Sequence, residues 1–133
     1  MPPPIVQPAP LSLLAFAARG AFTAGLLAVT VLSLAPIATL PTLSLSDKIN
    51  HAIAYAFLAA TGCFGFGLTS LRAQLLVVAS LSLFGGMIEV LQPPIAGRSA
   101  TVGDAVANQI GIGLGWMLAR SATLLLRRQR WPR

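Results

Sequence analysis

The chain alternates long apolar runs with short polar or proline-containing interruptions. Each apolar run has about the 20 residues that an α-helix needs to cross the hydrocarbon core of a membrane. Proline removes a backbone donor and clashes inside a helix, so Pro36 and Pro41 should end the first run and the prolines of residues 92–94 the third. The pattern predicts an all-α membrane protein, a bundle of four transmembrane helices at residues 20–38, 49–69, 73–91 and 103–125.

The remaining segments are short. Residues 1–18 are rich in proline and are expected to form a disordered tail, residues 19–126 form one transmembrane domain, and residues 127–133 form a basic tail. The first apolar run has a second interpretation, a cleaved secretory signal, because Arg19 precedes it and small residues such as Ala35 follow it. Pro36, directly after Ala35, argues against cleavage.

Composition strengthens the membrane interpretation. The 133 residues are 56% hydrophobic and only 9% charged, whereas a soluble domain carries about 25% charged residues. A water-soluble domain of this length leaves much of its surface wet and could not hide so much apolar area. The lone Cys63 excludes a disulfide framework within the chain and is interpreted as a packing residue.

The net charge of +6 follows the membrane topology and does not predict a nucleic-acid partner. Lysine and arginine are enriched on the cytoplasmic side of membrane proteins. Four spans place both termini on one side, and that side receives most of the basic residues. The expected orientation therefore has both termini in the cytoplasm, with these residues on the cytoplasmic side: Arg19, Arg72, Arg120, Arg127, Arg128, Arg130 and Arg133.

The rare polar residues gather at the opposite, extracytoplasmic side. All three acidic residues and the single histidine belong to this group, which lies at the ends of the predicted helices and in the connection between the last two. Its members are Asp47, Lys48, His51, Glu89, Gln92, Arg98, Asp104 and Asn108.

Helical spacing places these residues on shared faces. Residues spaced by four on the second helix are Asp47, His51 and Tyr55, and Glu89 and Gln92 share a face of the third. On the fourth helix a stripe continues from polar residues into glycines, which let another helix approach closely: Asp104, Asn108, Gly111 and Gly115. The three faces are predicted to converge inside the bundle near its outer end.

Simpler interpretations exist for most of these residues. Asp47 and Asp104 suit the positive end of a helix, with Ser44 and Thr101 as caps three positions earlier. Lys48 can extend to the interface, and His51 and Tyr55 can be packing residues. Glu89 is harder to dismiss.

A carboxyl inside a span is costly and usually has a partner. Glu89 lies within the third predicted span, with Arg98 as its first expected partner and Lys48 or His51 next.

The stretches "DKINHAIAYAFL" and "GGMIEVLQPPIAGRSATVGDAVANQIGIGLG" resemble the VanZ-like family of small bacterial membrane proteins. The resemblance covers about residues 44–118. "PPIA" and "RSATVGD" depart from the family pattern, so that Thr101 stands where an aspartate is common. The matching positions are Asp47, Lys48, His51, Tyr55, Glu89, Gln92, Gly97, Arg98, Asp104, Asn108, Gly111 and Gly115.

The resemblance implies a multi-pass protein of the bacterial cytoplasmic (inner) membrane and a role in the cell envelope. The family is named for a protein associated with low-level glycopeptide (teicoplanin-type) resistance, and the resemblance implies no particular reaction.

The first functional hypothesis is that the outer cluster binds, and could process, the headgroup of an anionic lipid or cell-wall precursor. Lys48 and Arg98 would hold phosphate, and His51 is a candidate general acid or base. The candidate catalytic residues are His51, Glu89 and Asp104; the candidate ligand-binding residues are Asp47, Lys48, Tyr55, Gln92, Arg98 and Asn108; Gly111 and Gly115 are assigned to helix packing. Membrane lipids are the expected partners, and a homo-oligomer stays possible.

Other hypotheses stay open. The polar cluster could serve only to fix helix packing, without a ligand. Transport of a small ion is disfavoured by four short spans with the acidic residues at one end. A metal site of Asp47, His51 and Glu89 has thin support from a single histidine without a cysteine cluster, so no metal or other cofactor is predicted.

Overall fold

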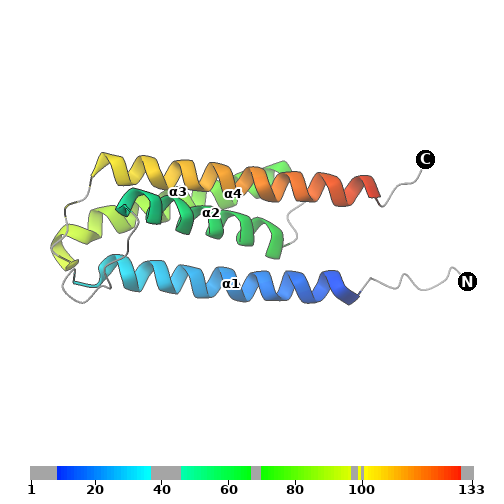
Figure 1. The fold of residues 1–133 in the computed structure, drawn as a ribbon, viewed down its shortest axis with the longest axis horizontal. Helices are drawn as coiled ribbons and strands as arrows, with labels where there is room; N and C mark the ends of the chain where they lie inside the picture. Colours follow the sequence, from blue (N-terminus) through cyan, green and yellow to red (C-terminus); the bar gives the residue numbers. More distant parts are fainter. Residues whose placement is uncertain (1–8, 37–45, 67–69, 97–98, 100, 130–133) are drawn as a thin grey trace, which may run out of the picture.

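The described part of the chain is all-helical. The computed structural model describes residues 9–36, 46–66, 70–96, 99 and 101–129. These residues contain no strand and form four helices: α1 (Ala9–Leu34), α2 (Asp47–Gly65), α3 (Leu71–Ala96) and α4 (Val102–Gln129) (Figure 1). The predicted all-α class is therefore confirmed for this part of the chain.

Successive helices run in opposite directions, so the first turn of α1 and the last turn of α4 lie at the same end of the bundle (Figure 1). At the other end α1 and α3 finish and α2 and α4 begin. We call this second end the polar end, because seven of the polar residues singled out above lie in the helix halves nearest to it: Asp47, Lys48, His51, Glu89, Gln92, Asp104 and Asn108.

Helix α1 begins earlier than predicted from the sequence. It starts at Ala9 and includes residues 9–18, which were assigned to a disordered tail. Pro10 stands in the first turn, where the missing backbone N–H would have had no partner in the helix. The residues from Leu11 to Ala18 are almost all apolar, and they extend the helix without a break.

Helix α3 ends later than predicted. It continues through Pro93 and Pro94 to Ala96, so the expectation that these prolines end the helix is wrong. The two prolines leave the carbonyls of Glu89 and Val90 without their helical N–H partners. This loss falls in the last turn, where both prolines are exposed, so the long helix before them is unaffected.

Polar side chains are buried in this bundle and large apolar side chains are exposed on every helix. Leu27 of α1, Phe57 of α2, Leu83 of α3 and Leu114 of α4 are all exposed, Leu83 at 77%. The buried polar side chains are Gln74, Glu89, Gln92, Asp104 and Asn108. So many large exposed apolar side chains, on every helix, are unusual for a water-soluble domain.

Two of the four helices are long and apolar enough to cross a membrane, α1 from Leu13 to Leu34 and α3 over Leu71–Ala96. Helix length and composition alone are weak support, because the core helix of a soluble protein passes the same test. A core helix would be mostly buried, however, whereas none of the α1 window and 28% of the α3 window is buried. The helices therefore give limited support to a membrane location.

Helix α2 packs most extensively against α4, and the two helices run parallel (Figure 1). Gly111 and Gly115 of α4 lie against the backbone carbonyls of Ala52 and Ala56 of α2. A Cβ atom at either glycine would overlap the facing carbonyl oxygen. Small residues spaced by four on both helices thus permit the close approach, as in small-xxx-small contacts of membrane helices.

Substituting Gly111 with alanine should destabilise the protein by about 1–3 kcal/mol, because the added methyl group forces α2 and α4 apart. Gly113 is the matched control on the same helix, since a Cβ there meets nothing within 4 Å. Gly113→Ala should be neutral or slightly stabilising, because alanine favours the helix. Thermal unfolding of both variants in detergent measures the difference, and equal stabilities would contradict the proposed contact.

Candidate functional site

Helices α2 and α4 begin side by side at the polar end, each with a side chain that caps its first turn. Ser46 is the N-cap of α2, and its hydroxyl accepts from the backbone N–H three residues later at 3.4 Å. Ser44 was expected to be the cap; it lies outside the described residues, and the helix starts directly after Ser46. Thr101 Oγ1 accepts from the N–H of Asp104 at 3.2 Å and donates to Asp104 Oδ2 at 2.6 Å.

Three side chains from three helices meet just inside these first turns. His51 Nδ1 of α2 lies 3.0 Å from Asn108 Oδ1 of α4 and 3.7 Å from Glu89 Oε1 of α3. Asn108 Nδ2 donates to the same Glu89 oxygen at 3.5 Å. Asn108 is 1% exposed and Glu89 is 7% exposed, so these contacts replace hydration that the side chains have lost.

The Glu89 carboxyl oxygen determines which atoms carry hydrogen in this group. It turns the amide NH₂ of Asn108 toward itself, so the amide oxygen faces His51. The Nδ1 atom of His51 must then be the donor, because Asn108 Oδ1 can only accept. The other ring nitrogen, Nε2, faces Asp47 Oδ2 at 3.9 Å.

Lys48 and Asp104 form an ion pair beside this group, with Lys48 Nζ 3.9 Å from Asp104 Oδ1. The Lys48 side chain is 62% exposed and the Asp104 side chain only 8%. A pair with one partner in solvent contributes little to stability. The exposed ammonium group is therefore available to other partners, whereas the Asp104 carboxylate is held in place by Thr101 and by burial.

Two buried oxygen atoms, Tyr55 Oη and Glu89 Oε2, have no hydrogen-bond partner among the described residues. A buried polar atom without a partner costs about 1–3 kcal/mol. Native structures rarely tolerate such atoms without an explanation such as an unseen ligand or water. We call His51, Asn108 and Glu89 the polar group. One of its atoms, Glu89 Oε2, can still form a hydrogen bond.

The other candidate residues lie apart from this group. Gln92 Nε2 donates to the backbone carbonyl of Ser33 at 3.3 Å, and so joins α3 to the last turns of α1. Tyr55 lies in the apolar core, with its ring against Gly85 and tilted against Phe84.

Only one of the three partners expected for Glu89 is seen to contact it among the described residues. Arg98, the first choice, lies with Gly97 outside the described residues. Of the other two choices, His51 contacts Glu89, and Lys48 is paired with Asp104 instead.

One group among the described residues has the geometry to hold a metal ion. Asp47, His51 and Asp104 each offer one ligand atom, and these atoms lie within 4.8 Å of one another. The set considered from the sequence contained Glu89 in place of Asp104. Glu89 instead contacts the Nδ1 side of the His51 ring, away from the Nε2 atom that faces Asp47.

Three contacts at the opposite end were missed from the sequence. Trp116 Nε1 donates to Gln74 Oε1 at 3.2 Å, and Gln74 is fully buried. Arg19 Nε donates to the carbonyl of Gly65 at 2.7 Å, and its guanidinium group lies 5.6 Å from the centre of the Phe66 ring. A polar residue inside an apolar run was the available signal for Gln74, since such residues in a span usually face a partner.

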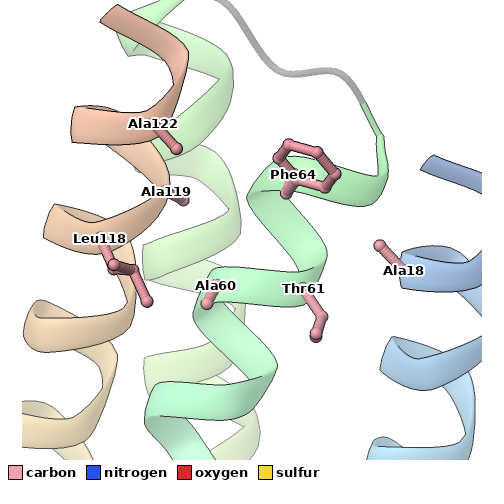
Figure 2. Close-up of a pocket in the computed structure, with 7 residues that line it drawn as sticks. All are labelled: Ala18, Ala60, Thr61, Phe64, Leu118, Ala119 and Ala122. Carbon is pink, nitrogen blue, oxygen red and sulfur yellow. The ribbon is translucent and has the colours of Figure 1, made fainter. Parts of the chain in front are cut away.

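A pocket between α1, α2 and α4 lies toward the same opposite end (Figure 2). It has a volume of about 250 Å³ and is lined mainly by alanines, together with Thr61, Phe64 and Leu118. Among the described residues no charged side chain lines it, and it is separate from the polar group.

Protein-family models, curated proteins and solved structures include none that matches this chain. The resemblance to the VanZ-like family thus stays a prediction from the sequence motifs.

Replacing Asn108 with alanine should lower the free energy of unfolding by about 1–3 kcal/mol, because His51 and Glu89 both lose a buried partner. The neighbouring Gln109 is the matched control: it is exposed and accepts from Ser82 at 2.8 Å. Gln109→Ala should cost less than about 1 kcal/mol. Unfolding in detergent compares the two, and an Asn108→Ala variant as stable as Gln109→Ala would contradict the network.

Proposed function

We propose that this chain is a four-span protein of the bacterial cytoplasmic membrane with both termini in the cytoplasm. Its polar end faces the extracytoplasmic surface and binds the headgroup of an anionic lipid or lipid-linked cell-wall precursor. Through its resemblance to the VanZ-like family, this role is linked to glycopeptide resistance. The proposal is one of binding and includes no reaction.

Two observations support the four spans and their orientation. Large apolar side chains are exposed on α2 and α4 as well as on α1 and α3, so all four helices offer a surface suited to lipid. Arg19, Arg72 and Arg120 belong to the helix halves away from the polar end. Basic residues favour the cytoplasmic side, so this asymmetry orients the polar end outward.

The observation that carries the binding proposal is the buried polar group with incomplete hydrogen bonding. A network that served only to join helices would be expected to satisfy all its own atoms, because an unsatisfied buried atom weakens the packing it supports. Glu89 Oε2 and Tyr55 Oη have no partner among the described residues. The position of Glu89, beside His51 and Asn108 at the polar end, favours a polar ligand from the headgroup region.

Exposed positive charge at the polar end supports an anionic ligand. Lys48 has an exposed ammonium group, a compact point charge that suits phosphate. Arg98 lies between α3 and α4 in the sequence, and we assign it the same role from the sequence motif alone.

A second candidate function is purely structural. The contacts of His51, Asn108 and Glu89 join α2, α4 and α3, and such a network can fix how helices pack without any ligand. The two candidates differ in what the loss of an exposed cation does, because an anionic ligand needs Lys48 and Arg98, whereas the contacts among His51, Asn108 and Glu89 do not involve Lys48.

Lipids retained by the purified protein should be enriched in anionic species, and Arg98→Ala should reduce that enrichment about tenfold, the loss expected when one charge-assisted contact to phosphate is removed. Lys48→Gln should act in the same direction. Arg72→Ala is the matched control, since it removes an exposed cation at the other end of α3. Mass spectrometry of co-purified lipids, with thermal unfolding alongside, measures the effect.

Equal loss of anionic lipid in Arg72→Ala and Arg98→Ala would contradict a specific site at the polar end. No enrichment in the folded wild-type protein would contradict the binding proposal itself. Loss of folded protein in Glu89→Gln, with normal stability and no lipid enrichment in the wild type, would favour the structural candidate.

A further inference from the structure

The polar end carries more negative than positive charge in the described part of the chain. Asp47, Glu89 and Asp104 are all there, and Lys48 is the one permanently charged cation described beside them. Lys48 is also largely in solvent. With Arg98, which the sequence motif assigns to the same end, three carboxyl groups still outnumber two permanent cations, so additional positive charge would favour an anionic headgroup there.

His51 is oriented so that one nitrogen of its ring faces carboxylate. Its Nδ1–H is used in the hydrogen bond to Asn108 Oδ1. When the imidazole is neutral, Nε2 carries a lone pair, and this atom lies 3.9 Å from Asp47 Oδ2. That distance is too long for a hydrogen bond. Two electron-rich atoms facing each other across such a gap are stabilised by a cation between them.

We propose that Asp47, His51 and Asp104 form a binding site for one divalent metal ion. Each of the three residues offers one ligand atom within 4.8 Å of the others. We assign Nε2 as the His51 ligand, because Nδ1 is bonded to Asn108 and Nε2 faces Asp47. Ligands of tetrahedral zinc, at about 2.0–2.2 Å from the metal, lie roughly 3.3–3.5 Å apart. The three atoms therefore need to close by about 1.5 Å at most. The Asp47 side chain, 56% exposed, has room to make that movement.

The surroundings of His51 support this assignment independently of the three ligands. A histidine that binds metal usually donates its other ring N–H to an oxygen acceptor, which fixes the tautomer and the ring orientation. Asn108 is that acceptor, and it is held in turn by Glu89. Both side chains are at least nine-tenths buried. Glu89 also retains a buried oxygen without a hydrogen-bond partner among the described residues.

The ligand set selects a class of metal. One imidazole with two carboxylates suits ions such as Zn²⁺ and Mn²⁺, whereas Mg²⁺ prefers six oxygen ligands in near-octahedral geometry. Three protein ligands leave a coordination position open. If the proposed function is correct, and this step rests on it, a phosphate oxygen of the headgroup fills that position and the metal supplies the missing positive charge.

Replacing Lys48 provides a test in which the variant is expected to bind the metal ion more tightly than the wild type does. Its ammonium group lies 3.9 Å from Asp104 Oδ1, so it competes electrostatically with a metal ion for the same carboxylate. Removing the charge should tighten metal binding. A gain of affinity cannot result from a poorly folded variant.

The test uses the full chain in detergent without a polyhistidine tag, stripped with a chelator and titrated with ZnCl₂ by calorimetry. We expect one Zn²⁺ per chain, weakened at least about tenfold by Asp47→Asn or Asp104→Asn. Lys48→Gln should bind Zn²⁺ roughly threefold more tightly. Gln109→Ala, an exposed change beside Asn108, should bind as the wild type does, and MgCl₂ should not compete at equal concentration.

Absence of saturable Zn²⁺ binding, binding that persists in both aspartate variants, or weaker binding in Lys48→Gln would each overturn the metal site. Lipid retention is measured in the same samples with and without Zn²⁺. Metal binding without any enrichment of anionic lipid supports the metal site and contradicts the proposed function. Enrichment that is unchanged by the chelator supports the proposed function and overturns the bridging role of the metal.

Discussion

The close approach of α2 and α4 is the contact on which the rest of the structure depends. Gly111 and Gly115 let the backbone of α4 lie against the carbonyls of Ala52 and Ala56, and larger residues would hold the two helices apart. The same approach, nearer the polar end, brings His51 within 3.0 Å of Asn108. The glycine contact is purely steric, yet it sets the spacing at which the polar side chains can bond to one another.

The polar group of His51, Asn108 and Glu89 matters because it is buried inside the bundle. In water, a lost contact between His51, Asn108 and Glu89 could be replaced by solvent, but these side chains are largely buried in a bundle whose outer surface is apolar. Within lipid, such side chains depend on one another or on a ligand. The network satisfies one oxygen of Glu89 and leaves the other without a described partner. Incomplete bonding at this position is the reason to favour a binding site over helix packing alone.

Much of this arrangement follows from simple patterns in the sequence. The lengths of the apolar runs give the number of helices, and spacing by four places His51 and Asn108 on inward faces. Helix ends were less predictable. Helix α1 ends at Leu34, before Pro36 as expected, but Pro10 stands in its first turn, and α3 continues through Pro93 and Pro94. Partners across helices were not predictable either, because the choice of His51 and Asn108 for Glu89 depends on helix rotation, which periodicity alone does not specify.

The central claim is that Asn108 holds His51 by Nδ1 and leaves Nε2 open to a ligand. His51 is the single histidine of the chain, so ¹⁵N NMR of histidine-labelled protein in lipid nanodiscs reports on this ring alone. The account predicts that the neutral ring is protonated at Nδ1, with the Nε2 resonance shifting on addition of Zn²⁺ and the Nδ1 resonance nearly unchanged. A neutral ring protonated at Nε2, or two resonances insensitive to Zn²⁺, would contradict it.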